Sequence, residues 1–512
     1  MRVSSSTIGR WIVGIGCAVV ASFVLFTFQQ RAISDEPDLK PSGRTKEEVA
    51  RPYCSDWPKP AMTFFITGRQ YGYIEPCGCT GLEFQKGGLA RRKTLYNDLV
   101  GRGWDIIPID LGNQVRRFGP QAAIKFATTM SALKDMDYKA VGLGPHDLRI
   151  ESGELISEIV DETPLVSSNV MIAGLPVSGG HKIIKSGKYR IGIASVMGEN
   201  EQRGIRSPDI EFKKPAQAVA EAHAQFTKAK CSLMVLLCYA STEETKAIAM
   251  SSAQARDFRV VITAGGADEP ALEPIRIPGT RSFMVQTGKK GMYVGVLGVF
   301  PASNVPMRYE RIPLDKRFKD SPDVLQSLTN YQQQLETIYK KDWSKLVMKP
   351  VDHPTGRKFL GSAACQDCHE TAYEKWLTTP HHEATHSISN PTERSDIPRH
   401  FDPECLSCHV TGWNAQDYYP YVSGYTELEA SKHLHGNGCE NCHGPGSAHV
   451  AAENGDDDLT DAQIENIRKS MVLPLASAQE RCLTCHDLDN DPNFHEEGAF
   501  EKYWKQIEHY ED

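Results

Sequence analysis

Four copies of one pentapeptide pattern, Cys-x-x-Cys-His, occur in the last third of this 512-residue chain. Such a pattern is the attachment signature of c-type haem, because two thiols add to the two vinyl groups of one haem and the following histidine lies beneath its iron as the proximal ligand. The alternative, in which the CxxC units pair to form four-cysteine zinc sites, requires no histidine in the fifth position. The sequence therefore predicts four covalently attached haems c. The predicted haem-binding residues are Cys365, Cys368 and His369 (motif 1), Cys405, Cys408 and His409 (motif 2), Cys439, Cys442 and His443 (motif 3), and Cys482, Cys485 and His486 (motif 4).

Cysteine and histidine are concentrated around these motifs. Residues 361–512 hold 8 of the 14 cysteines and 13 of the 17 histidines. Four haems in this segment leave fewer than about 40 residues per haem, which is too few for a protein core of ordinary size. We therefore expect the porphyrins to form much of the core, and the polypeptide around them to be loop-rich and mostly helical.

The sequence around the motifs resembles one family. The runs GSAACQDCHETAYEKWLTTPHHEATH, DPECLSCHVTGW and GNGCENCHGPGSAHV are similar to the cytochrome c-554 family of multihaem cytochromes, over roughly residues 358–490. Members are electron carriers, several with mostly bis-histidine haems, and some relatives keep one haem open. The resemblance implies that His381, or the adjacent His382, and His449 are distal iron ligands.

Nine histidines of this segment lie outside the motifs, whereas only four distal positions exist. After His381 and His449, the next candidates are His433 and His435, because they shortly precede Cys439. Met471 is a possible thioether ligand, although a role in the core is the simpler reading. The nine histidines are His381, His382, His386, His400, His433, His435, His449, His495 and His509.

The preceding part of the chain predicts an α/β domain. Apolar runs typical of strands alternate with stretches typical of helices. Residues 322–347 carry apolar residues at helical spacing and predict a connecting helix that docks on one face. The expected strands are AMTFFIT, DIIPIDLG, KIIKSGKYRIGIASV, CSLMVLLCYA, RVVITAG, SFMVQTG and MYVGVLGVF, and the expected helices cover residues 121–135, 216–230 and 242–255.

This α/β domain resembles the calcineurin-like metallophosphoesterases, especially their 5'-nucleotidase branch. The resemblance rests on FFITGRQYGYIEPCGC, GGLARRKTLYNDL, DIIPIDLGN, AVGLGPHDL, LMVLLCYAS and VVITAGG, in that order. It implies a layered sandwich with two metals, which would activate a water and polarise a phosphoryl group.

The metal ligands of that family are mostly replaced in this chain. The catalytic histidine persists as His146, with Asp147 beside it, and an arginine at a ligand position adds positive charge where a dication needs a carboxylate. We therefore expect the fold to survive without phosphoesterase activity. The replaced positions are Arg69, Tyr71, Asn113, Pro145, Tyr239 and the stretch 266–268.

Two cysteines, Cys77 and Cys79, lie in the loop near the former metal site. If they pair, one intervening residue makes a strained, redox-labile disulfide. A pairing with Cys54, soft-metal binding and a purely structural role are the alternatives.

Residues 11–28 form an uncharged apolar stretch preceded by Arg2 and Arg10, which predicts a membrane anchor with the remainder on the extracytoplasmic, periplasmic side. A cleaved signal peptide is the alternative, and the residues after Phe28 fit a cleavage site poorly. The predicted organisation is an anchor or signal segment (1–30), a tether (31–57), a degenerate metallophosphoesterase-like domain (58–315), a connecting helix (316–357) and a tetrahaem cytochrome c domain (358–512).

The net charge of −8 does not favour nucleic acid as a partner. We expect redox proteins as electron donor and acceptor, and an electron carrier rather than a catalyst. The alternatives are an oxidoreductase that acts on a small nitrogen or sulfur species at an open haem, a phosphoesterase with accessory haems, and a redox sensor or scaffold that uses Cys77 and Cys79.

Overall fold

In the structure, a computed structural model, residues Asp56–Asp512 form one compact unit. It describes residues 52–75, 85–117, 119–160, 163–303, 306–392, 396–455, 458–487 and 490–509. The predicted anchor at residues 11–28 and the pair Cys77 and Cys79 lie outside these ranges. Within them, every helix is too short or too polar to cross a membrane.

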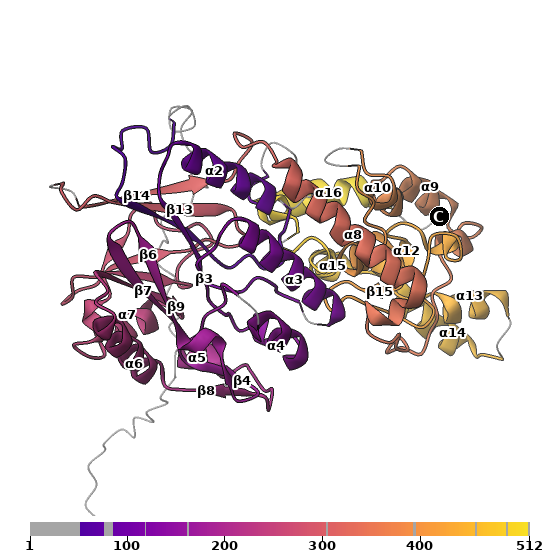
Figure 1. The fold of residues 1–512 in the computed structure, drawn as a ribbon. Helices are drawn as coiled ribbons and strands as arrows, with labels where there is room; N and C mark the ends of the chain where they lie inside the picture. Colours follow the sequence, from indigo (N-terminus) through magenta and orange to yellow (C-terminus); the bar gives the residue numbers. More distant parts are fainter. Residues whose placement is uncertain are drawn as a thin grey trace, which may run out of the picture. The chain divides into compact units, whose positions relative to one another are not determined.

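Two β-sheets form the centre of the α/β domain (Figure 1). In the first, β1 (Met62–Thr67) pairs antiparallel with β13 (Tyr293–Val299) and aligns Met62 with Val299. It pairs parallel with β2 (Ile106–Asp110) and aligns Thr67 with Asp110. The first sheet has the order β14 (Met307–Pro313), β13 (Tyr293–Val299), β1 (Met62–Thr67), β2 (Ile106–Asp110) and β3 (Ala140–Val141). The second has the order β11 (Ile275–Arg276), β12 (Phe283–Gln286), β10 (Val260–Thr263), β9 (Leu233–Tyr239), β7 (Tyr189–Met197) and β6 (His181–Ser186).

The two sheets pack face to face. One buried cluster joins Phe64 and Ile109 of the first sheet to Ile193, Val235 and Ile262 of the second. Alternating residues of β9 and β10 point to the opposite face, where they pack against Phe226 and Ile248 of the covering helices. This packing confirms the predicted α/β fold, and all seven expected strand runs contain a strand.

Helices cover the outer faces of both sheets. The three helices expected from the sequence are α3 (Pro120–Asp135), α6 (Pro215–Lys228) and α7 (Thr242–Met250), and α7 ends before the expected residue 255. The helices of this domain are α2 (Leu89–Gly101), α3 (Pro120–Asp135), α4 (Ser152–Val160), α5 (Glu199–Gln202), α6 (Pro215–Lys228) and α7 (Thr242–Met250), and a small sheet is formed by β5 (Leu175–Pro176), β4 (Val170–Ile172) and β8 (Ile210–Phe212).

The expected connecting helix is α8 (Pro322–Asp342). Val324, Leu328, Tyr331, Leu335 and Tyr339 are its buried apolar side chains, at the spacing of one helical face, and the helix packs against α2 and α3. At its far end, the Tyr339 ring lies 5.5 Å from the ring of Phe401 in the motif segment. The helix therefore contacts both parts of the chain.

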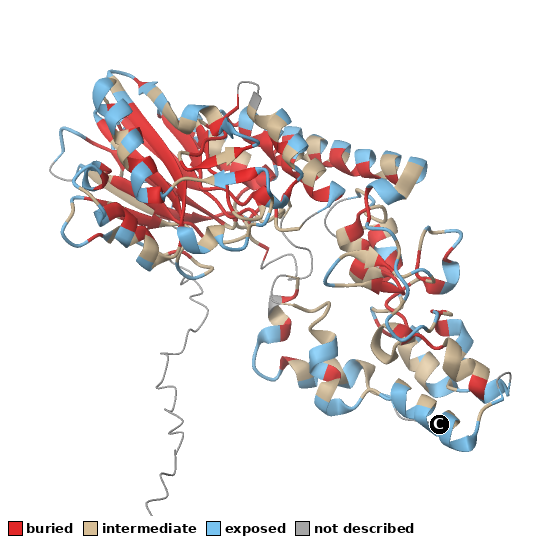
Figure 2. Cartoon of the chain, turned by 90° about the horizontal axis from the view of Figure 1, so that it is seen from below, coloured by how far each residue is buried: buried red, intermediate tan, exposed pale blue. Residues whose placement is uncertain are grey.

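The C-terminal segment contains short helices joined by loops and a two-stranded sheet. Fewer of its side chains are buried than in the sheets of the α/β domain (Figure 2). Two of its helices, α9 (Glu370–Leu377) and α14 (Asp461–Met471), bury none of their described side chains. The elements are α9 (Glu370–Leu377), α10 (Ala384–Ser389), α11 (Pro403–His409), β15 (Trp413–Asn414), β16 (Tyr419–Pro420), α12 (Cys439–His443), α13 (Ser447–Asn454), α14 (Asp461–Met471), α15 (Leu475–Cys482) and α16 (Ala499–Ile507).

Candidate functional site

Each Cys-x-x-Cys-His motif occupies about one helical turn. Motifs 2 and 3 lie in α11 and α12, whereas motif 1 precedes α9 and motif 4 begins at the end of α15. The backbone N–H of His369 donates to the carbonyl of Cys365 at 2.9 Å, and that of His486 donates to Cys482 at the same distance. The turn therefore brings both thiols and the imidazole of a motif to one side, as attachment to a single haem requires.

Three of the four motif histidines have their Nδ1 atom held by an acceptor. The distances are 2.8 Å from His409 to the carbonyl of Ala384, 2.7 Å from His443 to the carbonyl of Met471, and 2.8 Å from His486 to a carboxylate oxygen of Asp491. An imidazole that donates from Nδ1 presents the lone pair of Nε2, which is the atom that binds a metal. Burial lowers the pKa of both His409 and His443 and so favours this neutral form.

Three motif histidines face another imidazole at a nearly constant distance. The ring centres of His369 and His449 are 6.2 Å apart, those of His486 and His381 are 6.1 Å apart, and those of His443 and His509 are 5.8 Å apart. A metal–imidazole bond is about 2 Å long and the ring centre lies about 1 Å behind the nitrogen, so two imidazoles on opposite sides of one metal have centres about 6 Å apart. These pairs fit a haem iron between them.

His409 of motif 2 differs from the other three. Among the described residues, no imidazole faces it at a comparable distance. The candidate His435 is used elsewhere, because its Nε2 lies 2.9 Å from the carbonyl of Leu428. The ring of His382 packs on Trp376 with centres 4.8 Å apart, so His381 rather than His382 makes the facing pair.

Two further candidate ligands from the sequence, Met471 and His509, differ in where the structure places them. Met471 offers its carbonyl to His443, and its sulfur lies 3.6 Å from the guanidinium of Arg357. His509, by contrast, had no signal in the sequence beyond being a histidine, since it lies well beyond the last motif. Only the fold brings it to His443.

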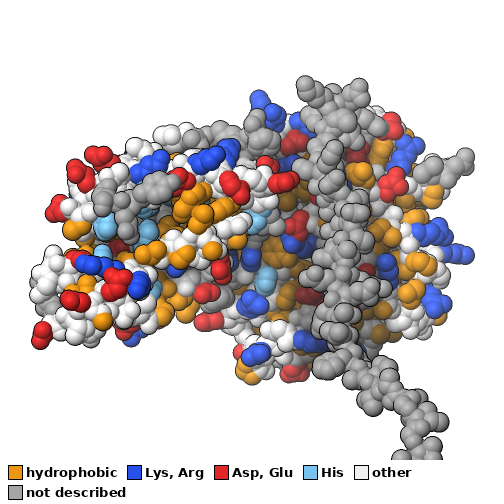
Figure 3. Space-filling view, turned by 180° about the vertical axis from the view of Figure 1, so that it is seen from behind, with side chains coloured by type: hydrophobic (Ala, Val, Ile, Leu, Met, Phe, Trp, Pro, Cys, Tyr) orange, Lys and Arg blue, Asp and Glu red, His pale blue; other side chains and the backbone are white. Residues whose placement is uncertain are grey.

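The motifs follow one another in space in the order 1, 3, 4, 2. The thiols of Cys365 and Cys439 are hydrogen-bonded, as are those of Cys485 and Cys408. The thiol of Cys442 lies close enough to Cys482 and Cys485 for their charges to interact. Figure 3 shows histidine and hydrophobic side chains next to one another on the surface of the C-terminal segment.

Residues beside motif 2 contact the α/β domain and the connecting helix. The carboxylate of Asp402, at the N-cap of α11, accepts from the side-chain amides of Gln121 at 2.5 Å and Gln332 at 3.1 Å. The ammonium of Lys125 lies 2.7 Å from the carboxylate of Glu404. The end of the motif series is therefore held by α3 and α8.

The positions expected from the phosphoesterase resemblance come together at the carboxyl ends of β1, β2 and β9. The hydroxyls of Tyr71 and Tyr239 lie 3.3 Å apart, and the Asn113 amide donates to Tyr239 at 2.5 Å. Nε of Arg69 donates to Tyr71 at 3.3 Å, and the Asn113 amide lies 3.4 Å from Nδ1 of His146. A network of phenol, amide and guanidinium groups therefore fills this position.

Asp147 holds the loops of this network together. Its carboxylate accepts the backbone N–H groups of Asn113 and Gln114 at 2.7 Å and that of Gly144 at 2.9 Å. Burial raises its pKa to about 7, against the opposing effect of these N–H donors. Within the described ranges, no three His, Cys, Asp or Glu side chains are grouped to hold a metal ion.

The motif segment matches a family model. Residues 364–444 match the family described as cytochrome c554 and c-prime. A curated relative, cytochrome c-554 of Nitrosomonas europaea, is 32% identical over 97 residues, which are 17% of this chain and 39% of the relative. The predicted cytochrome c554 resemblance is confirmed for this segment, and the chain spans less than half of the relative.

The solved structures similar to this chain share little sequence with it. The sulfate thiohydrolase SoxB of Thermus thermophilus, in complex with glycerol, is 12% identical, with a TM-score of 0.46 over 58% of this chain and 63% of that one. A 5'-nucleotidase precursor from the same organism is 16% identical, with a TM-score of 0.46 over 62% of this chain and 66% of that one.

Proposed function

We propose that this chain is a tetrahaem c-type cytochrome that carries electrons on the periplasmic side of a membrane, attached through residues 11–28. The facing imidazole pairs carry the proposal. His369 with His449, His443 with His509, and His486 with His381 would hold three irons between two imidazoles each. The motif cysteines would bind the porphyrins, and the haem, when bound, supplies the redox chemistry.

The spatial order of the motifs supports a carrier. The thiols of motifs 1 and 3 and those of motifs 4 and 2 are hydrogen-bonded, and those of motifs 3 and 4 lie close to one another. Electrons would therefore pass along one series from motif 1 through motifs 3 and 4 to motif 2. With two imidazoles to hold each iron at motifs 1, 3 and 4, no coordination site would remain there for a substrate. Redox proteins are the partners that such a series requires.

The proposal is tested by the haem content and redox behaviour of the purified protein. Pyridine haemochrome and intact mass should give four covalent haems per chain. Stopped-flow spectroscopy should show that all four haems are reduced. Zinc in place of haem would overturn the proposal. Haem that is present but cannot be reduced would overturn the carrier role alone.

A second function is favoured by the position of His409. Because no imidazole faces it among the described residues, the iron of motif 2 would keep an axial position for a small nitrogen or sulfur species. Turnover of hydroxylamine, nitrite or sulfite by the reduced or oxidised protein would favour this oxidoreductase. Electron exchange without turnover would favour the carrier.

The α/β domain is proposed to be catalytically silent as a phosphoesterase. Arg69 would repel a dication from the position where the resemblance places a carboxylate, and Tyr71, Tyr239 and Asn113 bond to one another. Its role would be to hold motif 2 through α3 and α8. Metal-dependent hydrolysis of nucleotide phosphoesters that is abolished by His146→Ala would contradict this part.

A further inference from the structure

A cavity of about 190 Å³ lies where the α/β domain meets the segment that carries motif 2. Its walls are the loop after β2, the first turn of α3, the turn at His146, residues 346–348 after α8, and residues beside Cys405 and before β16. The lining residues with a charged group or an imidazole are Arg116, Arg117, His146, Arg149, Glu404 and Asp417.

The lining carries an excess of positive charge. Three guanidiniums oppose two carboxylates, and one of these carboxylates, Glu404, is already paired with Lys125 at 2.7 Å. The guanidinium of Arg117 lies 4.1 Å from the ring centre of Tyr418, which orients it by a cation–π contact. Among the described residues, neither Arg117 nor Arg149 has a carboxylate within ion-pair distance.

The groups around His146 also show that the cavity is positively charged. Burial and the charges of Arg149, Arg116 and Arg117 lower the pKa of His146 to about 4, so all three guanidiniums act on one imidazole. Gly119 and Pro120 also line the cavity, which places the start of the 16-residue helix α3 there. A helix N-terminus adds partial positive charge and favours an anion.

The size of the cavity limits the ligand. Sites for drug-sized ligands and cofactors occupy about 300–1,000 Å³, whereas a water molecule takes about 30 Å³. The cavity therefore has room for an inorganic oxyanion with a few waters, and it is too small for a nucleotide.

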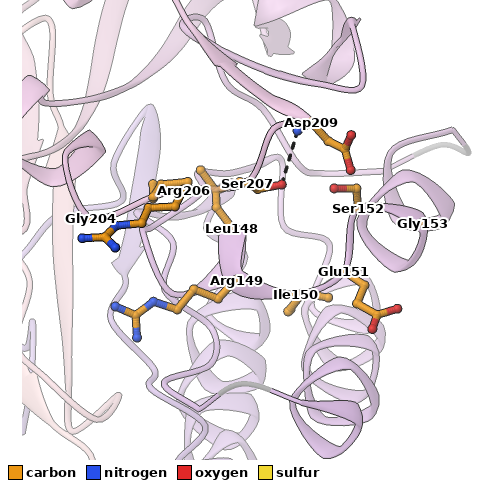
Figure 4. A pocket seen from close by; sticks show the side chains of 11 residues that line it. Leu148, Arg149, Ile150, Glu151, Ser152, Gly153, Gly204, Arg206, Ser207 and Asp209 are labelled. Atoms are coloured by element: carbon orange, nitrogen blue, oxygen red, sulfur yellow. Dashed lines mark hydrogen bonds between the residues drawn. The ribbon is translucent and has the colours of Figure 1, made fainter.

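A neighbouring hollow is a weaker candidate. It has a volume of about 700 Å³, shares Arg149 with the cavity, and is lined by both signs of charge. Figure 4 shows the side chains of Arg149 and Arg206 on one side of it and those of Glu151 and Asp209 on the other. Mixed charge along a wide hollow gives no preference for one ligand class, so Arg206 serves below as a control.

We propose that the cavity between Arg117, Arg149 and the motif 2 segment is a metal-free binding site for a small inorganic oxyanion of the phosphate, sulfite or nitrite class. The guanidiniums would donate N–H groups to its oxygens, and the neutral imidazole of His146 would contact it without adding charge. The site goes beyond the proposed function, because electron transfer between haems requires no bound anion.

The test is titration calorimetry of the full-length haem-loaded protein with inorganic phosphate, sulfite and nitrite separately. We expect saturable one-to-one binding of at least one of them. Arg117→Gln and Arg149→Gln should each weaken it at least tenfold, whereas Arg206→Gln should leave it unchanged. Haem content and circular dichroism of each variant show that it is folded.

A conservative variant separates charge from folding. Arg149→Lys should retain part of the affinity that Arg149→Gln loses, because the positive charge remains while the planar fork is lost. The proposal is overturned if none of the three anions binds in the millimolar range. It is equally overturned if the folded double variant R117Q/R149Q binds as tightly as the unmodified protein. Neither result would change the haem count on which the proposed function depends.

Discussion

The ammonium of Lys125 on α3 lies 2.7 Å from the carboxylate of Glu404, the residue directly before the first cysteine of motif 2. The Lys125 side chain is almost fully buried, and that of Glu404 is 29% exposed. Burial lowers the pKa of Lys125, but Glu404 and Asp402 raise it by more, so the ammonium is charged. This contact ties the α/β domain to the end of the motif series.

Replacing Lys125 by methionine should destabilise the protein by about 1–3 kcal/mol, because it leaves the carboxylate of Glu404 largely buried without its partner. Urea unfolding of the haem-loaded protein measures the loss. The matched control is Lys134→Met on the same helix. The Lys134 side chain is 41% exposed and lies 3.4 Å from the carboxylate of Glu158, so this pair should contribute less than about 1 kcal/mol. Equal effects of the two variants would mean that the buried pair does not hold the domains together.

The unfolding free energy should depend on His146 in acid. Its pKa is about 4 in the folded protein, against about 6.5 in an unfolded chain, so the unfolded state binds this proton more readily. The unfolding free energy is therefore not reduced by this group above about pH 6.5, and it decreases as the pH falls from there towards 4. In His146→Gln this part of the acid sensitivity should disappear, whereas His386→Gln, at a 64% exposed side chain, should follow the unmodified protein. Parallel pH profiles for all three proteins would contradict the assignment.

The carboxylate of Asp491 should influence one haem through His486. Its oxygen lies 2.8 Å from Nδ1 of that imidazole, and such a partner raises the basicity of a ligating histidine. Asp491→Asn should therefore shift the reduction potential of one haem to a more positive value while four haems remain attached. Spectropotentiometry resolves the shift, with Asp367→Asn inside motif 1 as the control. A titration curve identical to that of the unmodified protein would show that Asp491 does not support a ligand.

The three facing histidines should be separable one at a time. His449→Ala, His381→Ala and His509→Ala should each convert one low-spin haem to high spin without loss of haem, because attachment depends on the thiols and the motif histidine. His495→Ala is the control, since the Nε2 of that residue lies 3.0 Å from the carbonyl of His486. An unchanged spectrum in His509→Ala would remove His509 as the partner of His443.

Much of this molecule could be predicted where the determinants are local. The four motifs follow from five-residue spacing, and the strands from apolar runs, because both depend on neighbours in the chain. The family resemblance indicated His381 and His449 as ligands without showing which motif each faces. That pairing, and the contact of His509 with His443, depend on tertiary packing between distant segments.

The α/β domain shows the same difference between local patterns and tertiary contacts. Arg69, Tyr71, Asn113 and Tyr239 were expected at former ligand positions, and they do converge. Their hydrogen-bond network could not be predicted from the sequence, because it depends on how the ends of three strands and the loops after them are placed relative to one another. The contact between α3 and motif 2 was likewise absent from the sequence analysis, since no local pattern marks Lys125 and Glu404 as partners.

The most direct test of the account is the EPR spectrum of the oxidised full-length protein, with the spins quantified against a haem count from pyridine haemochrome. We expect four haems per chain, three of them low-spin with paired imidazoles and one high-spin at His409. A protein without covalent haem, or one whose haems are predominantly high-spin, would contradict it.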